Sequence, residues 1–138
     1  MKTVKPVLLA VAATLAIGAS PVRAQEVVLK LHHFLPPQAT IQAQVFNPWC
    51  EKVGRESGGK IKCQIYPSMQ LGGTPPQLYE QARDGVADIV WTLPGYTAGR
   101  FPSVEVFELP FMMQNPEATS KALWDYVEQY ASAEFKDV

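Results

Sequence analysis

The amino-acid sequence predicts an α/β fold in which a mostly parallel sheet is flanked by helices. Short apolar or alternating runs recur along the chain, and they take turns with segments whose apolar residues repeat at helical spacing. Glycine and proline separate these segments, which is typical of turns between strands and helices. No internal repeat or low-complexity tract interrupts the order. The 138 residues therefore suit one small domain behind an N-terminal leader.

The leader is a predicted signal peptide covering residues 1–24. Lys2 and Lys5 give a positive start, residues 7–17 form an apolar run, and residues 22–24 have the sizes that a signal peptidase requires. The run is about half of the roughly 20 residues that a membrane-spanning helix needs, although an uncleaved anchor helix is the alternative. We expect cleavage after this segment and a periplasmic location.

The mature chain, residues 25–138, has an acidic balance. Removal of Lys2, Lys5 and Arg23 leaves nine basic residues against 13 acidic ones, a net charge of about −4 with both histidines neutral. No basic run occurs, which argues against a nucleic-acid or membrane-surface partner. No later segment is apolar enough to span a membrane, so the mature chain is not expected to be membrane-spanning.

The first strand is expected at residues 27–31, a β-branched and apolar run. A helix should follow, because four apolar residues recur every four positions. These are Ile41, Val45, Trp49 and Val53. Pro48 lies inside this pattern and should bend the helix, because proline lacks the N–H that a helix interior uses. Residues 61–65 alternate between apolar and polar side chains and predict a half-buried second strand.

The two cysteines, Cys50 and Cys63, lie in the predicted helix and in the second strand. A disulfide would be compatible with an oxidising compartment and would close a short loop, stabilising the fold by roughly 3 kcal/mol. Two small buried thiols fit the sequence equally well, so both alternatives stay open. The spacing matches no zinc site.

The second half of the chain continues the alternation. Thr74 can cap a helix whose inner face carries Leu78 and Tyr79, and a third strand is expected at residues 88–91. We expect a fourth strand at residues 104–109. Asn115 should cap a final helix that begins with a proline and an acidic residue and runs almost to the terminus.

The candidate binding residues follow the first and third strands, because ligands of open α/β sheets bind outside the carboxyl ends of the strands. Aromatic and apolar side chains here would form walls, and a few polar groups would fix the orientation of a ligand. The candidates are His33, Phe34, Trp91, Thr92, Leu93, Pro94 and Tyr96. Packing of Trp91 and Leu93 into the core is the competing interpretation.

The histidine pair suggests a different class of function. His32 and His33 are adjacent, so on a strand they point to opposite faces and cannot both bind one metal ion. We expect one solvated histidine and one at a strand end. An alternative is a periplasmic enzyme, or an envelope interaction domain, that uses His32 or His33 with Glu105 or Glu108. No sequence motif of a hydrolase, zinc protease or phosphate loop supports the enzyme, and no cofactor is indicated.

Three segments, in order and at compatible spacing, resemble the TRAP-transporter solute-binding proteins of the DctP type. Residues 66–73 resemble the P-x-x-Q-L-G turn of that family, residues 83–89 its G-x-x-D strand entry, and residues 107–111 its F-x-L-P-F segment. The resemblance covers about residues 28–130.

This resemblance implies a two-lobed, periplasmic-binding-protein-like fold that closes on an organic acid, without catalysis, and delivers it to TRAP membrane permease subunits. Residues 25–138 would form a partial N-terminal lobe, with the second lobe and the family's carboxylate-binding arginine expected beyond Val138. Phe34 and Leu93 are apolar where some members carry polar ligand contacts. We therefore expect a less hydrophilic ligand, such as an aromatic or branched acid.

Overall fold

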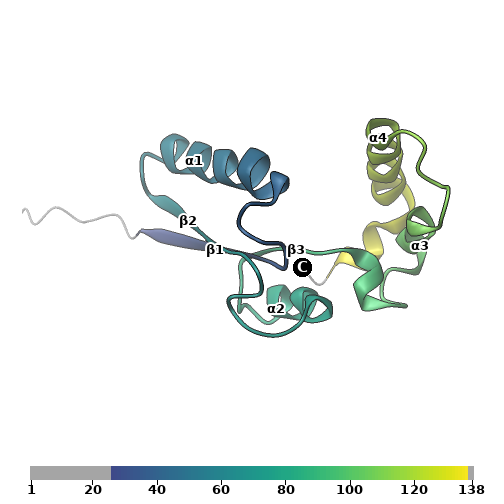
Figure 1. The fold of residues 1–138 in the computed structure, drawn as a ribbon, viewed down its shortest axis with the longest axis horizontal. Helices are drawn as coiled ribbons and strands as arrows, with labels where there is room; N and C mark the ends of the chain where they lie inside the picture. The colour runs from purple at the N-terminus through teal and green to yellow at the C-terminus, as the bar shows by residue number, and fades with distance from the viewer. Residues whose placement is uncertain (1–25, 137–138) are drawn as a thin grey trace, which may run out of the picture.

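A computed structural model describes residues 26–136 as a parallel sheet with helices on both faces and a helical C-terminal part (Figure 1). The strands are β1 (Val27–His33), β2 (Ile61–Tyr66) and β3 (Ile89–Trp91). Their order is β2-β1-β3, and both pairings are parallel. The α/β prediction is therefore confirmed for this part of the chain, whereas the predicted signal peptide lies outside the described residues.

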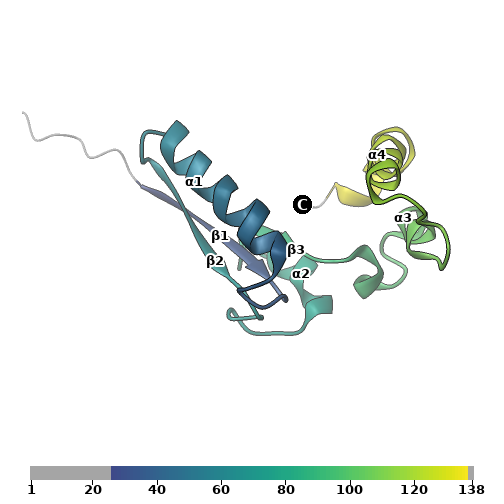
Figure 2. The same cartoon turned by 45° about the horizontal axis from the view of Figure 1, so that its top comes forward.

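Two helices cover opposite faces of this sheet, as Figures 1 and 2 both show. Helix α1 (Asn47–Glu56) is joined to β2 by a disulfide between Cys50 and Cys63, whose Cα atoms are 5.4 Å apart. Helix α2 (Leu78–Arg83) packs its fully buried Leu78 toward the other face. Of the two alternatives for the cysteines, the structure contains the disulfide.

The buried face of the first helix differs from the predicted one. Val45 and Trp49 are 52% and 40% exposed, whereas Phe46 is buried. The reason is a π-helical turn at Gln42–Phe46, in which the N–H of Asn47 donates to the carbonyl of Gln42. A π-turn adds one residue to the helix and so rotates the faces on its two sides relative to each other. The sequence predicted an irregularity near Pro48, but it did not predict that a different face of the helix would be buried.

The predicted fourth strand is wrong. Residues 102–108 form the short helix α3 (Pro102–Glu105) and a 3₁₀ turn (Val106–Glu108). Pro102 at the first helical turn favours this start, and Val104 points into a core. Alternating Val and Glu suits a strand or a short amphipathic helix, so the pattern alone did not distinguish the two.

The last helix agrees with the prediction. Helix α4 (Pro116–Tyr126) begins at Asn115, whose side chain accepts a hydrogen bond from the N–H of Ala118 at 2.9 Å. A π-turn at Val127–Ala131 and a 3₁₀ turn at Ser132–Phe135 continue it. None of the side chains of α4 is fully buried.

A small second core connects the helical part of the molecule, residues 102–136, to the sheet part, residues 27–91. Its buried members are Tyr79, Phe101, Val104 and Ala131. Tyr79 belongs to α2, and its ring meets that of Phe101 edge to face at 5.2 Å. The segment of residues 92–101 leads from β3 to α3 (Figure 1). It is therefore held at one end by β3 and at the other by the contact of Phe101 with Tyr79 on α2.

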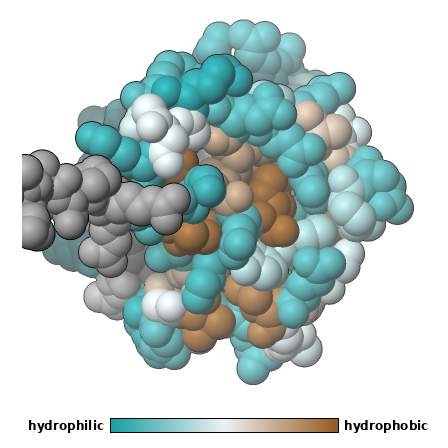
Figure 3. Space-filling model, turned by 90° about the vertical axis from the view of Figure 1, so that its left-hand side faces the viewer, coloured by the Kyte–Doolittle hydropathy of each residue, from teal (hydrophilic) through white to brown (hydrophobic). Residues whose placement is uncertain are grey.

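The end of the molecule where β1 begins is largely polar, with apolar patches between the polar residues (Figure 3). Its exposed apolar side chains include Val27 and Val28, which are 48% and 39% exposed. Within residues 26–136, no helix combines the length and the apolar character that crossing a membrane requires.

Candidate functional site

The carboxyl ends of β1 and β3 lie side by side, as expected for two neighbouring parallel strands. His33 pairs with Trp91 in the register, so their side chains are on the same face of the sheet, the face that α1 covers. Phe34 follows directly after β1. The two segments that the sequence singled out therefore meet at one edge of the sheet.

Three of the predicted residues form an aromatic cluster at this edge. The ring of Phe34 lies 5.2 Å from that of Trp91 and 5.3 Å from that of Tyr96, centroid to centroid, and both pairs are tilted. These are the separations at which aromatic rings attract each other. Phe34 and Trp91 are half-buried and Tyr96 is 40% exposed, so the cluster presents an apolar surface to solvent.

Phe46 supports the cluster from below and was not among the predicted residues. Its ring is 6.4 Å from Trp91 and 5.2 Å from His33. Phe46 ends the π-turn before α1, and its side chain lies over the end of β1. Phe46 lies next to Val45 of the apolar repeat. If the irregularity expected near Pro48 had been taken to rotate the helix as well, it would have pointed to Phe46 as the buried residue.

Three further predicted residues lie beside the cluster without belonging to it. Leu93 and Pro94 line an apolar cavity of about 220 Å³ between the end of β3 and α4, together with Phe107 and Leu123. Thr92 is half-buried, and its hydroxyl has no hydrogen-bond partner. Trp91 and Phe34 do not line this cavity, so the predicted residues divide between a surface cluster and an adjacent hollow.

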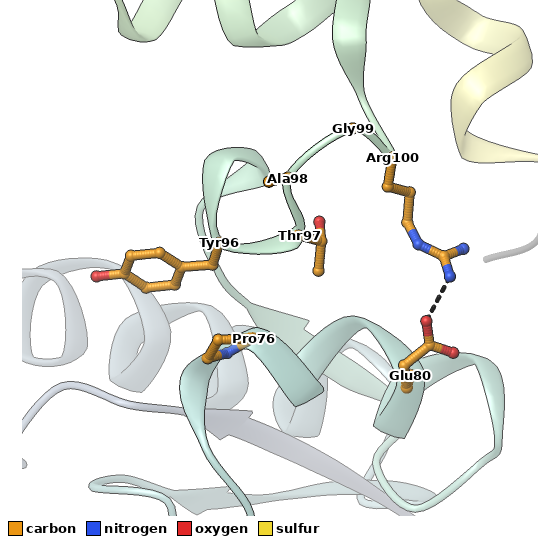
Figure 4. Close-up of a pocket in the computed structure, with 7 residues that line it drawn as sticks. All are labelled: Pro76, Glu80, Tyr96, Thr97, Ala98, Gly99 and Arg100. Carbon is orange, nitrogen blue, oxygen red and sulfur yellow. Dashed lines mark hydrogen bonds and ion pairs between the residues drawn. The ribbon is translucent and has the colours of Figure 1, made fainter.

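Tyr96 also borders a more open groove of about 480 Å³, drawn in Figure 4. On its far side, Arg100 forms an ion pair with Glu80 at 2.5 Å, and its guanidinium lies over the ring of Tyr79 at 4.4 Å. Glu80 also pairs with Arg83. Both arginines near the groove are therefore already paired with carboxylates.

His32 is a structural residue. It is fully buried, its Nδ1 lies 2.7 Å from Oε1 of Gln81, and its Nε2 accepts a hydrogen bond from the N–H of Leu71 at 3.4 Å. Since Nε2 accepts in this arrangement and Oε1 of Gln81 can only accept, Nδ1 is the donor of the first bond. The expectation that one histidine is solvated is wrong, because the α2 face and the loop after β2 cover this position.

His33 is also fully buried, on the opposite face of the sheet. Neither ring nitrogen has a hydrogen-bond partner of good geometry, and nor does the buried Oε1 of Gln42. Burial lowers the pKa of the His33 side chain, while its interaction with Gln42 opposes that shift. Burial therefore favours the neutral form of the His33 ring, which lies beneath the aromatic cluster and exposes no surface of its own.

The geometry gives the enzyme alternative no support among the described residues. The carboxylates of Glu105 and Glu108 accept hydrogen bonds from backbone N–H groups of Gly99 and Gly95 rather than from a histidine. Residues 26–136 also contain no cluster of three metal-binding side chains. This edge of the sheet offers an aromatic surface against which a flat apolar group can pack.

A parallel α/β lobe with an aromatic surface at the carboxyl ends of its strands is typical of a small-molecule binding protein. The chain matches the family described as bacterial extracellular solute-binding protein, family 7 (DctP), over residues 31–137, and it belongs to that family.

Solved structures of TRAP solute-binding proteins agree with this assignment. One, from Rhodoferax ferrireducens T118 with copurified benzoate, is 59% identical, has a TM-score of 0.75, and is matched over 80% of this chain and 34% of its own. A second, from a marine metagenome and described as specific for aromatic acid ligands, contains 3-hydroxybenzoate. It is 59% identical with a TM-score of 0.77, over 82% of this chain and 35% of its own.

Among curated proteins, the outer membrane transporter protein TsaT of Comamonas testosteroni is 29% identical over 112 residues, which are 80% of this chain and 32% of that protein. The chain thus spans about a third of the length of the relatives that it matches. The two solved relatives are described as TRAP solute-binding proteins, in keeping with the resemblance found in the sequence motifs.

Proposed function

We propose that residues 25–138 form the first lobe of a TRAP-type solute-binding protein that captures an aromatic carboxylic acid without chemically changing it. The observation that carries this proposal is the contact of Phe34 with both Trp91 and Tyr96 at the carboxyl ends of β1 and β3. Two relatives that are 59% identical to this chain hold benzoate or 3-hydroxybenzoate.

The aromatic cluster suits the ring of such a ligand. A benzoate ring placed against Phe34 and Tyr96 would bury its apolar faces and gain the tilted or edge contacts that aromatic groups prefer. Leu93 and Pro94 would extend this apolar wall. The hydroxyl of Thr92 has no hydrogen-bond partner, and it would contribute one of the few polar contacts that orient a ligand. His33, which is fully buried, would lie behind the wall and not contact the ligand.

The carboxylate of the ligand needs a cation that this edge of the sheet does not offer. Arg100 and Arg83 are both engaged by Glu80. We therefore propose that the carboxylate is bound by an arginine of a second lobe, whose planar fork matches two oxygens. The first lobe would recognise the ring, the second lobe would recognise the charge, and closure would be stabilised by contacts to both.

The cellular setting follows from the family and from the sequence. We propose that residues 1–24 act as a cleaved signal peptide, that the mature protein works in the periplasm, and that it delivers its ligand to TRAP membrane permease subunits. The family description as extracellular solute-binding proteins supports an exported location.

The three tryptophans provide a direct test of the site. In a chain labelled with 5-fluorotryptophan, Trp91 lies in the proposed site, Trp49 on α1 and Trp124 on α4. Titration with benzoate should shift the ¹⁹F signal of Trp91 selectively, with weak affinity because one wall alone contacts the ring. The variants Trp49→Phe and Trp124→Phe assign the signals.

Two control ligands sharpen this test. Succinate carries carboxylates without a ring, and cyclohexanecarboxylate carries an apolar ring without aromatic faces. The proposal predicts that benzoate shifts Trp91 at lower concentration than either. Equal shifts of all three tryptophans, or a stronger response to succinate, would contradict it.

A further inference from the structure

The segment that carries Tyr96 is held by carboxylates of α2 and of residues 105–108. Glu108 Oε1 accepts a hydrogen bond from the N–H of Gly95 at 2.9 Å, and Glu105 Oε1 accepts one from the N–H of Gly99 at 2.8 Å. One glutamate thus accepts from the residue before Tyr96, and the other accepts from the third residue after it. Both come from the α3 region, the stretch that resembled a strand in the sequence.

The third attachment comes from the sheet part of the molecule. Glu80 on α2 pairs with Arg100, whose guanidinium also lies over the ring of Tyr79. In Figure 4 the side chains of Arg100 and Glu80 point toward each other, while the ring of Tyr96 points to the opposite side of the segment. The segment is therefore fixed from both sides, with Tyr96 directed away from the ion pair.

Gly95 is required for the first of these contacts for a steric reason. A Cβ atom built on Gly95 would lie 2.0 Å from Oε2 of Glu108 and 2.9 Å from its carboxyl carbon. Nonbonded heavy atoms do not approach each other that closely, so a residue larger than glycine would displace the carboxylate of Glu108. Gly95 does not have a positive φ, so the restriction at this position is steric.

We propose that Glu105, Glu108 and Glu80 are positioning residues for the ligand-binding wall: they hold the segment of residues 94–100 so that Tyr96 stays against Phe34 before a ligand arrives. This inference rests on the proposed function. Hydrogen bonds to ionised acceptors are stronger than neutral ones. A wall that is ordered in advance reduces the entropy lost when the ligand binds. None of the three carboxylates contacts the ligand in this account.

The first test needs no ligand. Nuclear Overhauser effects between the rings of Phe34 and Tyr96, which are 5.3 Å apart by centroid, report the position of Tyr96 in the chain itself. We expect these effects to weaken in Glu108→Leu and in Gly95→Ala. Glu108→Gln keeps an acceptor oxygen and should restore most of the signal. Glu117→Gln is the matched control, because that exposed glutamate pairs with Lys121 on α4.

The second test uses benzoate. The concentration that half-saturates the Trp91 signal should rise about threefold in Glu108→Leu and Gly95→Ala, because the cost of ordering Tyr96 now falls on binding. It should stay unchanged in Glu117→Gln. A purely structural role would lower the melting temperature without this selective change, and it would show no rescue by Glu108→Gln.

The two tests separate the failure of this inference from the failure of the proposed function. If the rings of Phe34 and Tyr96 stay in contact in Glu108→Leu and Gly95→Ala, the carboxylates do not position Tyr96 and the inference is overturned. If the ring contact is lost but the benzoate response is unchanged, Tyr96 is not part of the binding wall. That result overturns the proposed site together with the inference.

Discussion

The two parts of the molecule differ in how they bury their side chains. In the sheet part, the end of β1 is enclosed by a helix on each face, and Leu31, His32 and His33 are at most 2% exposed. In the helical part, α4 buries no side chain fully, and Trp124 and Phe111 are 65% and 96% exposed. The carboxyl end of β1 is thus enclosed, whereas α4 and the segment before it leave their largest apolar groups in solvent.

This difference indicates where stability and binding reside. The sheet part encloses the end of β1 between two helices, which gives a binding wall a packed support. The segment 92–101 bridges the two parts and carries Tyr96, so the position of one side of the wall depends on both. We therefore expect substitutions of fully buried residues in the sheet part to act mainly on the free energy of unfolding, and substitutions in the bridging segment to act mainly on the binding wall.

The largest expected effect is that of a core truncation in the sheet part. Leu78 on α2 is fully buried, so Leu78→Ala should lower the free energy of unfolding by about 2–5 kcal/mol. Trp124→Ala in the exposed helix should change it by no more than about 0.5 kcal/mol. Urea unfolding followed by circular dichroism measures both, and equal losses would remove the distinction between the two parts.

Loss of the disulfide should have the next largest effect. Cys50 and Cys63 are 13 residues apart in the sequence, so the double substitution to alanine should cost about 3 kcal/mol, chiefly by freeing the unfolded chain. A reductant should destabilise the unchanged protein by a similar amount and leave the double variant unaffected. A variant as stable as the oxidised protein would contradict this expectation.

Acidification should weaken the sheet part through His33. Because burial lowers the pKa of His33, the unfolded state binds more protons than the folded state below about pH 6.5. The free energy of unfolding should therefore fall as the pH is lowered through that range. Urea unfolding at roughly pH 7.5 and pH 5.5 measures the fall. His33→Gln should show a smaller one, and an equal fall in both proteins would assign the effect to other groups.

The smallest expected effect belongs to the surface of the helical part. Lys121 pairs with Glu117 four residues earlier on α4, and both side chains are more than 70% exposed. Lys121→Ala should therefore change stability by only about 0.3–0.5 kcal/mol, and less at high salt. A salt-independent loss of several kcal/mol would show that α4 is held by more than its described contacts.

Sequence patterns predicted the sheet part better than the helical part for a physical reason. Alternation in residues 61–65 reflects half-burial on a sheet, and the β-branched run of β1 suits an extended strand. Both are local properties of the sequence. The meeting of Phe34 with Trp91 followed from the strand ends alone. The buried position of Phe46 did not, because it depends on a π-turn that shifts the helix face by one residue.

The α3 region shows what local patterns cannot predict. Val104 and Val106 alternate with Glu105, which resembles a strand, but the structure uses the glutamates to bind backbone N–H groups of the segment before them. Such contacts depend on the path of the chain between Gly95 and Glu108, and no spacing rule specifies that path. These contacts of the two carboxylates could therefore be found only in the structure.

The proposed binding wall is the cluster of Phe34, Trp91 and Tyr96, against which the ring of an aromatic acid would pack. The most direct measurement replaces the matching region of the benzoate-containing Rhodoferax ferrireducens protein with this chain and measures benzoate affinity by calorimetry. Substituting Trp91→Leu should then weaken binding about tenfold, while Trp124→Leu leaves it unchanged. Equal affinity in the chimera and in its Trp91→Leu variant, both correctly folded, would contradict the account.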